Sequence, residues 1–290
     1  MNDPYDYDLD AKKTYNYVRL AIVGLVVALT ASVVLEWALN AHCIEGSISA
    51  YYYTPTHSVF VGALVAIGVL LIAIKGTRTE DLFLNLAGFM APIVALVPTS
   101  VPPVENRCSD TPVLFDDVRP MVNNNALAML LAGALAYTAV WLISRRRNDR
   151  STPLLKDGRN KIGLLVSAVV LALGTYLYFG QKTWFADHAH LASAGLMFLF
   201  IGVVVLINAL ATKQRFYRTA YWVVFAAMAA SGAVVLLVVL FGPEWRHVVL
   251  VIEVLEIAPF LVFWALQSAE LWNVGSRRVD VAADLPKMLA

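Results

Sequence analysis

The chain has 290 residues, of which 59% are apolar and only 15% are charged, with a net charge of +1. An ordinary soluble domain carries about 25% charged residues and has too little interior to bury so much apolar surface. The mean hydropathy of +0.67 therefore excludes a soluble protein, and the near-zero net charge gives no indication of nucleic-acid binding.

Eight apolar segments are long enough to be transmembrane helices, since a helix needs about 20 residues to cross a bilayer core. We expect an all-α membrane bundle with helices over Tyr17–Asn40, His57–Ile74, Leu82–Pro98, Asn124–Ser144, Lys161–Gly180, His188–Leu210, Tyr217–Phe241 and His247–Gln267. The third is the shortest, because Pro92 and Pro98 are expected to interrupt or end it. The corresponding regions are an N-terminal segment 1–16, a first half 17–144, a basic linker 145–160, a second half 161–267 and a tail 268–290.

The lysines and arginines orient these helices, since cytoplasmic loops are enriched in basic residues. If both termini are cytoplasmic, 18 of the 22 basic residues lie inside, and only Arg107, Arg119, Lys182 and Arg246 lie outside. We therefore expect cytoplasmic N and C termini. The run Arg145–Arg147 then lies on the inner side, where we expect it to contact anionic lipid.

Both cysteines fall on the outer side, Cys43 after the first predicted span and Cys108 after the third. Cysteines that face an oxidising compartment can pair, so we predict a Cys43–Cys108 disulfide. Two unpaired thiols are the alternative. The bond would join the first outer loop to the long second one, 99–123, which is itself a candidate surface for a partner protein.

An internal duplication is suggested by the start of two predicted spans. His57 and His190 each begin a His-x4-Gly pattern that ends at Gly62 and Gly195. Two halves of four helices each would share one orientation and form a parallel repeat. Chance similarity between apolar sequences is the alternative.

The five histidines all map to the predicted outer side: His42, His57, His188, His190 and His247. With Asp187, three of them (His57, His190 and His247) could bind a divalent metal such as zinc. They could also act as acid and base or sense the external pH. Scattered interfacial histidines are the alternative, and the chain has neither an HExxH nor a CxxC motif.

Glu253 and Glu256 are the most specific candidates for a binding site. They lie roughly 9 and 14 Å from the start of the last predicted span, three residues apart on one helix face. Intramembrane carboxylates usually face a cavity or a partner. We expect them to be protonated or to bind an ion or water. The alternative is a structural role, in which they hydrogen-bond across helices to groups such as Ser193 or Ser231.

A resemblance covers about the first third of the chain. Its residues are Gly46-Ser-Ile-Ser-Ala-Tyr-Tyr-Tyr-Thr54, Phe60-Val-Gly-Ala-Leu64, Glu80-Asp81, Asn85-Leu-Ala-Gly88 and Pro92-Ile-Val-Ala-Leu-Val-Pro98. This pattern resembles a family of uncharacterised bacterial integral membrane proteins, which implies a multi-pass protein of the bacterial plasma membrane and no particular activity. The element Ser47-Ile-Ser49 is also similar to one in DRAM-type membrane proteins, which have six spans rather than eight.

Three functional hypotheses follow. The first is an outward-facing cavity, lined by histidines and acids, that binds or transports a lipid, an ion or a small molecule at Glu253, Glu256, His247, His190, His57 and Asp187. The second is a metal-dependent hydrolase or transferase that acts on lipid of the outer leaflet. The third is a structural subunit or assembly factor of a membrane complex.

Overall fold

A computed structural model describes residues 4–39, 42–99, 108, 118–146, 158–242 and 245–276. Within these residues the chain forms eight α-helices, a short 3-10 helix and no strand. The helices are α1 (Pro4–Leu39), α2 (His57–Ala73), α3 (Arg78–Leu96), α4 (Arg119–Arg146), α5 (Gly158–Gly180), α6 (Lys182–Ala211), α7 (Arg215–Phe241) and α8 (Val248–Glu270), with the 3-10 helix η1 (Ser49–Tyr53) between α1 and α2.

Each predicted span overlaps one of these helices, which confirms the all-helical architecture, although α1 begins at Pro4 and α6 at Lys182, earlier than predicted. Among the described residues, six helices are long and apolar enough to cross a membrane, namely those at Asp10–Leu39, Arg78–Leu96, Arg119–Ile143, Lys182–Ala211, Arg215–Val238 and Val248–Glu270. The apolar helices at His57–Ala73 and Leu165–Gly180 are shorter. This length and composition are those of a multi-pass membrane protein. Eight crossings and cytoplasmic termini stay predictions.

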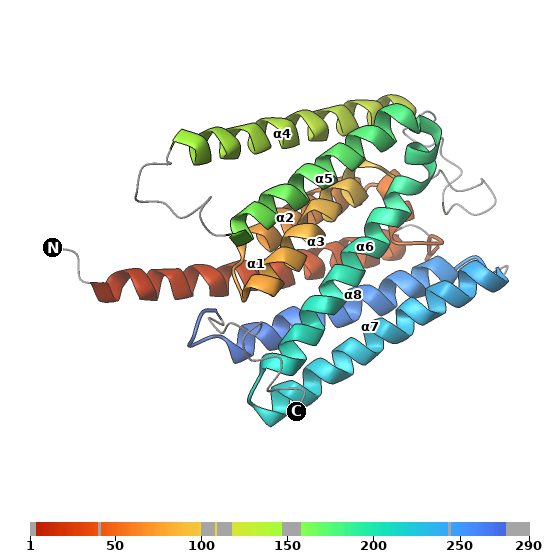
Figure 1. The fold of residues 1–290 in the computed structure, drawn as a ribbon. Helices are drawn as coiled ribbons and strands as arrows, with labels where there is room; N and C mark the ends of the chain where they lie inside the picture. Colours follow the sequence, from red (N-terminus) through yellow and green to blue (C-terminus); the bar gives the residue numbers. More distant parts are fainter. Residues whose placement is uncertain are drawn as a thin grey trace.

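Six helices enclose the main core, and two lie beside it (Figure 1). Neighbouring helices contact each other in the order α1, α2, α3, α6, α7, α8, and α8 returns to α1. The largest core cluster takes its buried side chains from these six helices, among them Ile22, Leu71, Ile201, Tyr221 and Trp264. The hairpin of α4 and α5 packs against the side of α3 and α6.

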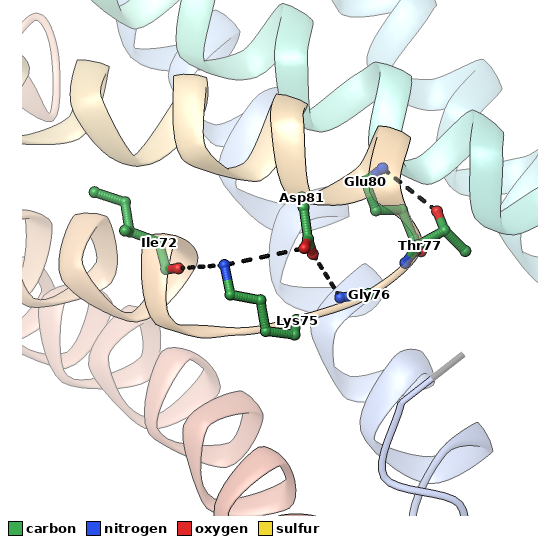
Figure 2. A network of polar contacts seen from close by, with 6 residues as sticks. All are labelled: Ile72, Lys75, Gly76, Thr77, Glu80 and Asp81. Carbon is green, nitrogen blue, oxygen red and sulfur yellow. Dashed lines mark hydrogen bonds and ion pairs between the residues drawn. The ribbon is translucent and has the colours of Figure 1, made fainter. Parts of the chain in front are cut away.

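The turn between α2 and α3 shows why α3 begins where it does (Figure 2). Thr77 caps the helix: its side chain accepts a hydrogen bond from the Glu80 N–H, and the Glu80 carboxylate accepts one from the Thr77 N–H at 2.7 Å. This reciprocal capping box satisfies two N–H groups that a helix start leaves free. Asp81 adds a hydrogen bond from the Gly76 N–H at 2.8 Å and an ion pair with Lys75 at 4.0 Å.

Our expectation that Pro92 interrupts the third span is wrong. Helix α3 runs through Pro92 and ends at Leu96, two residues before Pro98. Because Pro92 has no N–H, the carbonyl of Gly88 loses its usual partner in the helix. That carbonyl instead faces Gly68 of α2 so closely that a Cβ on Gly68 would lie 2.8 Å from the oxygen. The absence of side chains at these two glycines therefore lets α2 and α3 cross at close range.

The predicted disulfide is confirmed. Cys43 and Cys108 are bonded, with a Cα–Cα distance of 5.4 Å. Most of the outer loop 99–123, Arg147 and the last residues of the tail lie outside the described residues, as do the side chains of Arg145 and Arg146. The duplication stays a prediction, although the two histidines that suggested it differ in position: His57 opens α2, whereas His190 lies inside α6.

Candidate functional site

A loop at the disulfide-bonded end of the bundle packs against the first half of α8. This connecting loop comprises residues 42–56 and contains Cys43 and η1. The Gly46 carbonyl accepts a hydrogen bond from the Leu250 N–H of α8 at 3.0 Å. A Cβ on Gly46 would lie 3.0 Å from the carbonyl oxygen of Arg246, so a residue without a side chain favours this approach.

Glu253 is the residue of α8 that holds this loop. Its carboxyl group accepts hydrogen bonds from the backbone N–H groups of Ile48 and Ser49. The Ser49 hydroxyl makes a third contact, with its Oγ 2.6 Å from Glu253 Oε1. Three polar groups of the loop thus converge on one carboxyl group within the apolar helix α8.

Ser49 connects Glu253 to a histidine on a different helix. The Ser49 Oγ lies 2.9 Å from Nε2 of His190 in α6, and Nδ1 of the same ring lies 2.8 Å from the Val97 carbonyl oxygen. Ser49 and His190 are both buried, with exposed fractions of 8% and 7%. We call this continuous set of hydrogen bonds, from Glu253 through Ser49 and His190 to the Val97 carbonyl, the relay.

Local structure explains how the chain presents these groups. Val97 follows the last residue of α3 in an extended conformation, so its carbonyl has no donor within the helix and is free to accept from His190. The Ser47 side chain accepts from the Ala50 N–H at 2.9 Å and supports the start of η1. Tyr51 and Tyr52 of η1 are buried, and burial raises the pKa of both hydroxyls.

The structure brings only two of the predicted site residues, Glu253 and His190, to one place. The His57 ring packs against Tyr52 and its Nδ1 lies 2.8 Å from the Tyr52 carbonyl oxygen. His247 precedes α8, with Nε2 3.4 Å from the Ile44 carbonyl oxygen, and Asp187 is exposed. Within the described residues no three His, Cys, Asp or Glu side chains are placed to hold a metal ion. The metal site at His57, His190, His247 and Asp187 stays a prediction.

Glu256 belongs to a separate contact between α7 and α8. Ser231 of α7 hydrogen-bonds to Glu256 Oε1, which is the interhelical bond that the structural interpretation of this residue predicted. Both residues are buried, with exposed fractions of 7% for Glu256 and 2% for Ser231. The second carboxyl oxygen, Oε2, has no hydrogen-bond partner in the part of the chain that the structure describes. Glu253 and Glu256 therefore do not form one site.

A second polar network, which the sequence did not lead us to expect, lies at the opposite end of the bundle. Arg19 of α1 donates to Gln267 Oε1 at 3.1 Å, Gln267 donates to Asn208 Oδ1 at 3.1 Å, and Asn208 donates to Glu80 Oε1 at 2.5 Å. We call these four residues the inner network. A cavity of about 10 Å³, lined in part by Arg19, Glu80 and Gln267, has room for one water molecule.

Arg19 is only 1% exposed and Asn208 is fully buried, although the sequence analysis counted Arg19 among the basic residues of the cytoplasmic side. Asn208 interrupts an otherwise apolar run in α6. That interruption was the signal that could have revealed the network, because buried polar residues in membrane helices are costly unless they have partners.

Comparisons with known proteins give no relative. The chain matches no protein-family model, no curated protein and no solved structure.

Proposed function

We propose that this chain is an eight-span membrane protein with cytoplasmic termini that binds an ion or a small polar molecule at its outer end, as a receptor or as the first step of transport. The observation that carries this proposal is the contact between Glu253 and the connecting loop. A carboxyl group inside an apolar helix is expensive unless it serves a partner or a ligand. Here its partners belong to a loop at the end of the bundle, not to a neighbouring helix.

The distribution of charge supports the orientation. Four basic residues of the described turns, Lys75, Arg78, Lys213 and Arg215, lie at the end opposite the disulfide, whereas Lys182 and Arg246 lie at the disulfide end. Basic residues favour the cytoplasmic side and disulfides favour an oxidising compartment, so both observations support an outer position for the relay. The resemblance to bacterial integral membrane proteins makes the bacterial plasma membrane the proposed location, with Arg145–Arg147 near anionic lipid.

A cation screen tests the proposal. The purified protein in detergent would be heated in the presence of Na⁺, K⁺, Ca²⁺ or Zn²⁺ chloride at constant ionic strength. A ligand present at 100 times its dissociation constant adds about 2.7 kcal/mol of stability. We expect at least one cation to raise the Tm of the wild type and to leave the Tm of Glu253→Gln unchanged.

Asp10→Asn is the control, because Asp10 is an exposed carboxylate of α1 that belongs to none of the proposed sites. It should respond to the cation as the wild type does. The proposal is contradicted if none of the cations stabilises the wild type, or if Glu253→Gln is stabilised as strongly.

A hydrolase or transferase acting on outer-leaflet lipid is the second candidate, and one distance favours it. Ser49 Oγ is 2.9 Å from His190 Nε2, and the Val97 carbonyl orients the histidine. A hydroxyl beside a base that a third group holds is the arrangement of serine nucleophiles. Labelling of Ser49 by a fluorophosphonate probe, lost in His190→Gln, would support this candidate. An unlabelled Ser49 would count against it. The role of a structural subunit or assembly factor remains a proposal that rests on the loop 99–123.

A further inference from the structure

The number of hydrogen atoms in the relay can be counted from its hydrogen bonds. The Val97 carbonyl can only accept, so Nδ1 of His190 must carry the hydrogen of their 2.8 Å contact. A neutral imidazole that carries its hydrogen on Nδ1 has a bare Nε2, which can only accept. The tautomer of neutral His190 is therefore fixed by Val97.

Ser49 has one hydroxyl hydrogen but two neighbours that need one. Its Oγ is 2.9 Å from His190 Nε2 and 2.6 Å from Glu253 Oε1. If His190 is neutral and Glu253 is ionised, both neighbours are acceptors, and Ser49 can donate to only one of them. The other contact would bring two lone pairs together within hydrogen-bond distance, which is repulsive.

One additional proton removes this conflict. It can reside on Glu253, which then donates to Ser49 while Ser49 donates to His190. It can also reside on Nε2 of His190, which then donates to Ser49 while Ser49 donates to the Glu253 carboxylate. The two forms contain the same atoms and interconvert when two hydrogens shift along the hydrogen bonds. No other reactant is needed.

We propose that the relay is a binding site for one proton, which Glu253 and His190 share through the Ser49 hydroxyl. This inference rests on the proposed function, because it names the ion that the outer site binds. Release of the proton leaves Glu253 and His190 competing for one hydroxyl hydrogen, and the connecting loop loses one of its contacts with α6 or α8. Proton binding is thereby coupled to the docking of this loop.

Other charged and titratable groups lie on the elements packed against the relay. They are Glu45, Tyr51, Tyr52, His57, Asp187, Arg246, His247 and Glu256. The Glu45 carboxylate accepts from the Cys108 N–H at 3.1 Å, and Glu256 contacts Ser231. Arg246 and His247 both reach the Ile44 carbonyl oxygen. The hydroxyls of the two tyrosines are neutral at neutral pH, and burial raises their pKa further.

The test is a pH titration of the purified full-length protein in lipid nanodiscs, followed by two probes. Infrared difference spectroscopy reports the Glu253 carboxyl bands, assigned with Glu253→Gln. NMR reports the His190 ring, assigned with His190→Gln. Two groups that share one proton titrate as a pair, so both probes should change at one common midpoint in the wild type.

Ser49→Ala removes the bridge and should separate the two midpoints by about one pH unit or more, a tenfold change in relative proton affinity. Ser47→Ala, in the same loop, is the matched control and should keep the common midpoint, because Ser47 contacts the Ala50 N–H rather than the relay. Different midpoints in the wild type would overturn the inference, even if Ser49→Ala does not fold. A common midpoint that persists in Ser49→Ala would overturn it as well.

The two proposals fail separately. If the cation screen succeeds while the wild-type midpoints differ, the outer site binds a metal cation and shares no proton. If no cation binds while the midpoints coincide, the proposed binding of a metal cation is contradicted and the relay binds a proton alone. If no cation binds and the wild-type midpoints differ, both the proposed function and the shared proton are contradicted.

Discussion

Gly68→Ala tests the close crossing of α2 and α3, on which the position of Val97 depends. An added Cβ would lie 2.8 Å from the Gly88 carbonyl oxygen and 2.9 Å from Pro92 Cδ. Real Cβ atoms do not approach backbone atoms so closely, so the two helices must separate. Overpacking of this kind costs about 1–3 kcal/mol.

The same substitution elsewhere in α2 gives the matched control. Gly62 also lies inside α2, but nothing comes within 4 Å of a Cβ at that position. Gly62→Ala should therefore be neutral or should stabilise the protein by up to about 1 kcal/mol, the usual difference between glycine and alanine in a helix.

The assay is equilibrium unfolding of both variants in mixed detergent micelles, with helix content as the signal. Gly68→Ala should be less stable than Gly62→Ala by about 1–3 kcal/mol, which is the overpacking cost, because the gain in helix propensity is common to both variants. His190 ring signals should shift in Gly68→Ala alone, because displacement of α3 moves the Val97 carbonyl. Equal stability of the two variants would refute the close crossing.

Four further predictions follow from other contacts. Asn208→Ala should lower the free energy of unfolding by about 1–3 kcal/mol, because Glu80 and Gln267 lose a buried partner, whereas exposed Asn124→Ala should not. Equal losses would contradict the inner network. Reduction of the disulfide, which joins cysteines 65 residues apart, should cost about 4 kcal/mol on the chain-entropy account, and Cys43→Ser should become insensitive to reductant. His190→Ala should lower the Tm more than His188→Ala, because His188 is exposed and stacks on Trp184, and the reverse order would contradict the relay. The raised pKa of Tyr52 means that its contribution to stability is fully present below about pH 10 and is lost as the pH rises through the raised value, so Tyr52→Phe should lose less stability than the wild type between pH 9 and pH 11.

Helix positions could be predicted from the sequence because crossing a bilayer sets a strong requirement on length and apolarity. The effect of Pro92 could not, since it depends on what lies beside the helix. A proline usually disturbs a helix because it leaves one carbonyl without its hydrogen-bond donor. Here that carbonyl belongs to Gly88, and it can lie close to α2 because Gly68 has no side chain. The packing order of the six helices and the lateral position of the α4–α5 hairpin could not be predicted either, because the apolar pattern of one segment does not show which helices it contacts.

Two residues of the candidate site could be predicted, because titratable side chains are conspicuous in or beside apolar segments. Glu253 was notable from its depth in an apolar helix, and His190 from its place on the outer side. Their connection through Ser49 was not predictable, because Ser49 is separated from them by 204 and 141 residues and serine is common in loops. The inner network could not be predicted because a basic residue near the end of a membrane helix usually lies at the surface, whereas Arg19 is buried.

The disulfide has a consequence for how the protein is made. Cys43 and Cys108 are 65 positions apart in the sequence, and the chain between them contains all of α2 and α3. On the proposed eight-span topology, the two thiols reach the oxidising side of the membrane only when that pair of helices has inserted as a hairpin. Oxidation of the pair therefore records a completed insertion step, and newly synthesised chains in which this hairpin has failed to insert would be recognisable by their free thiols.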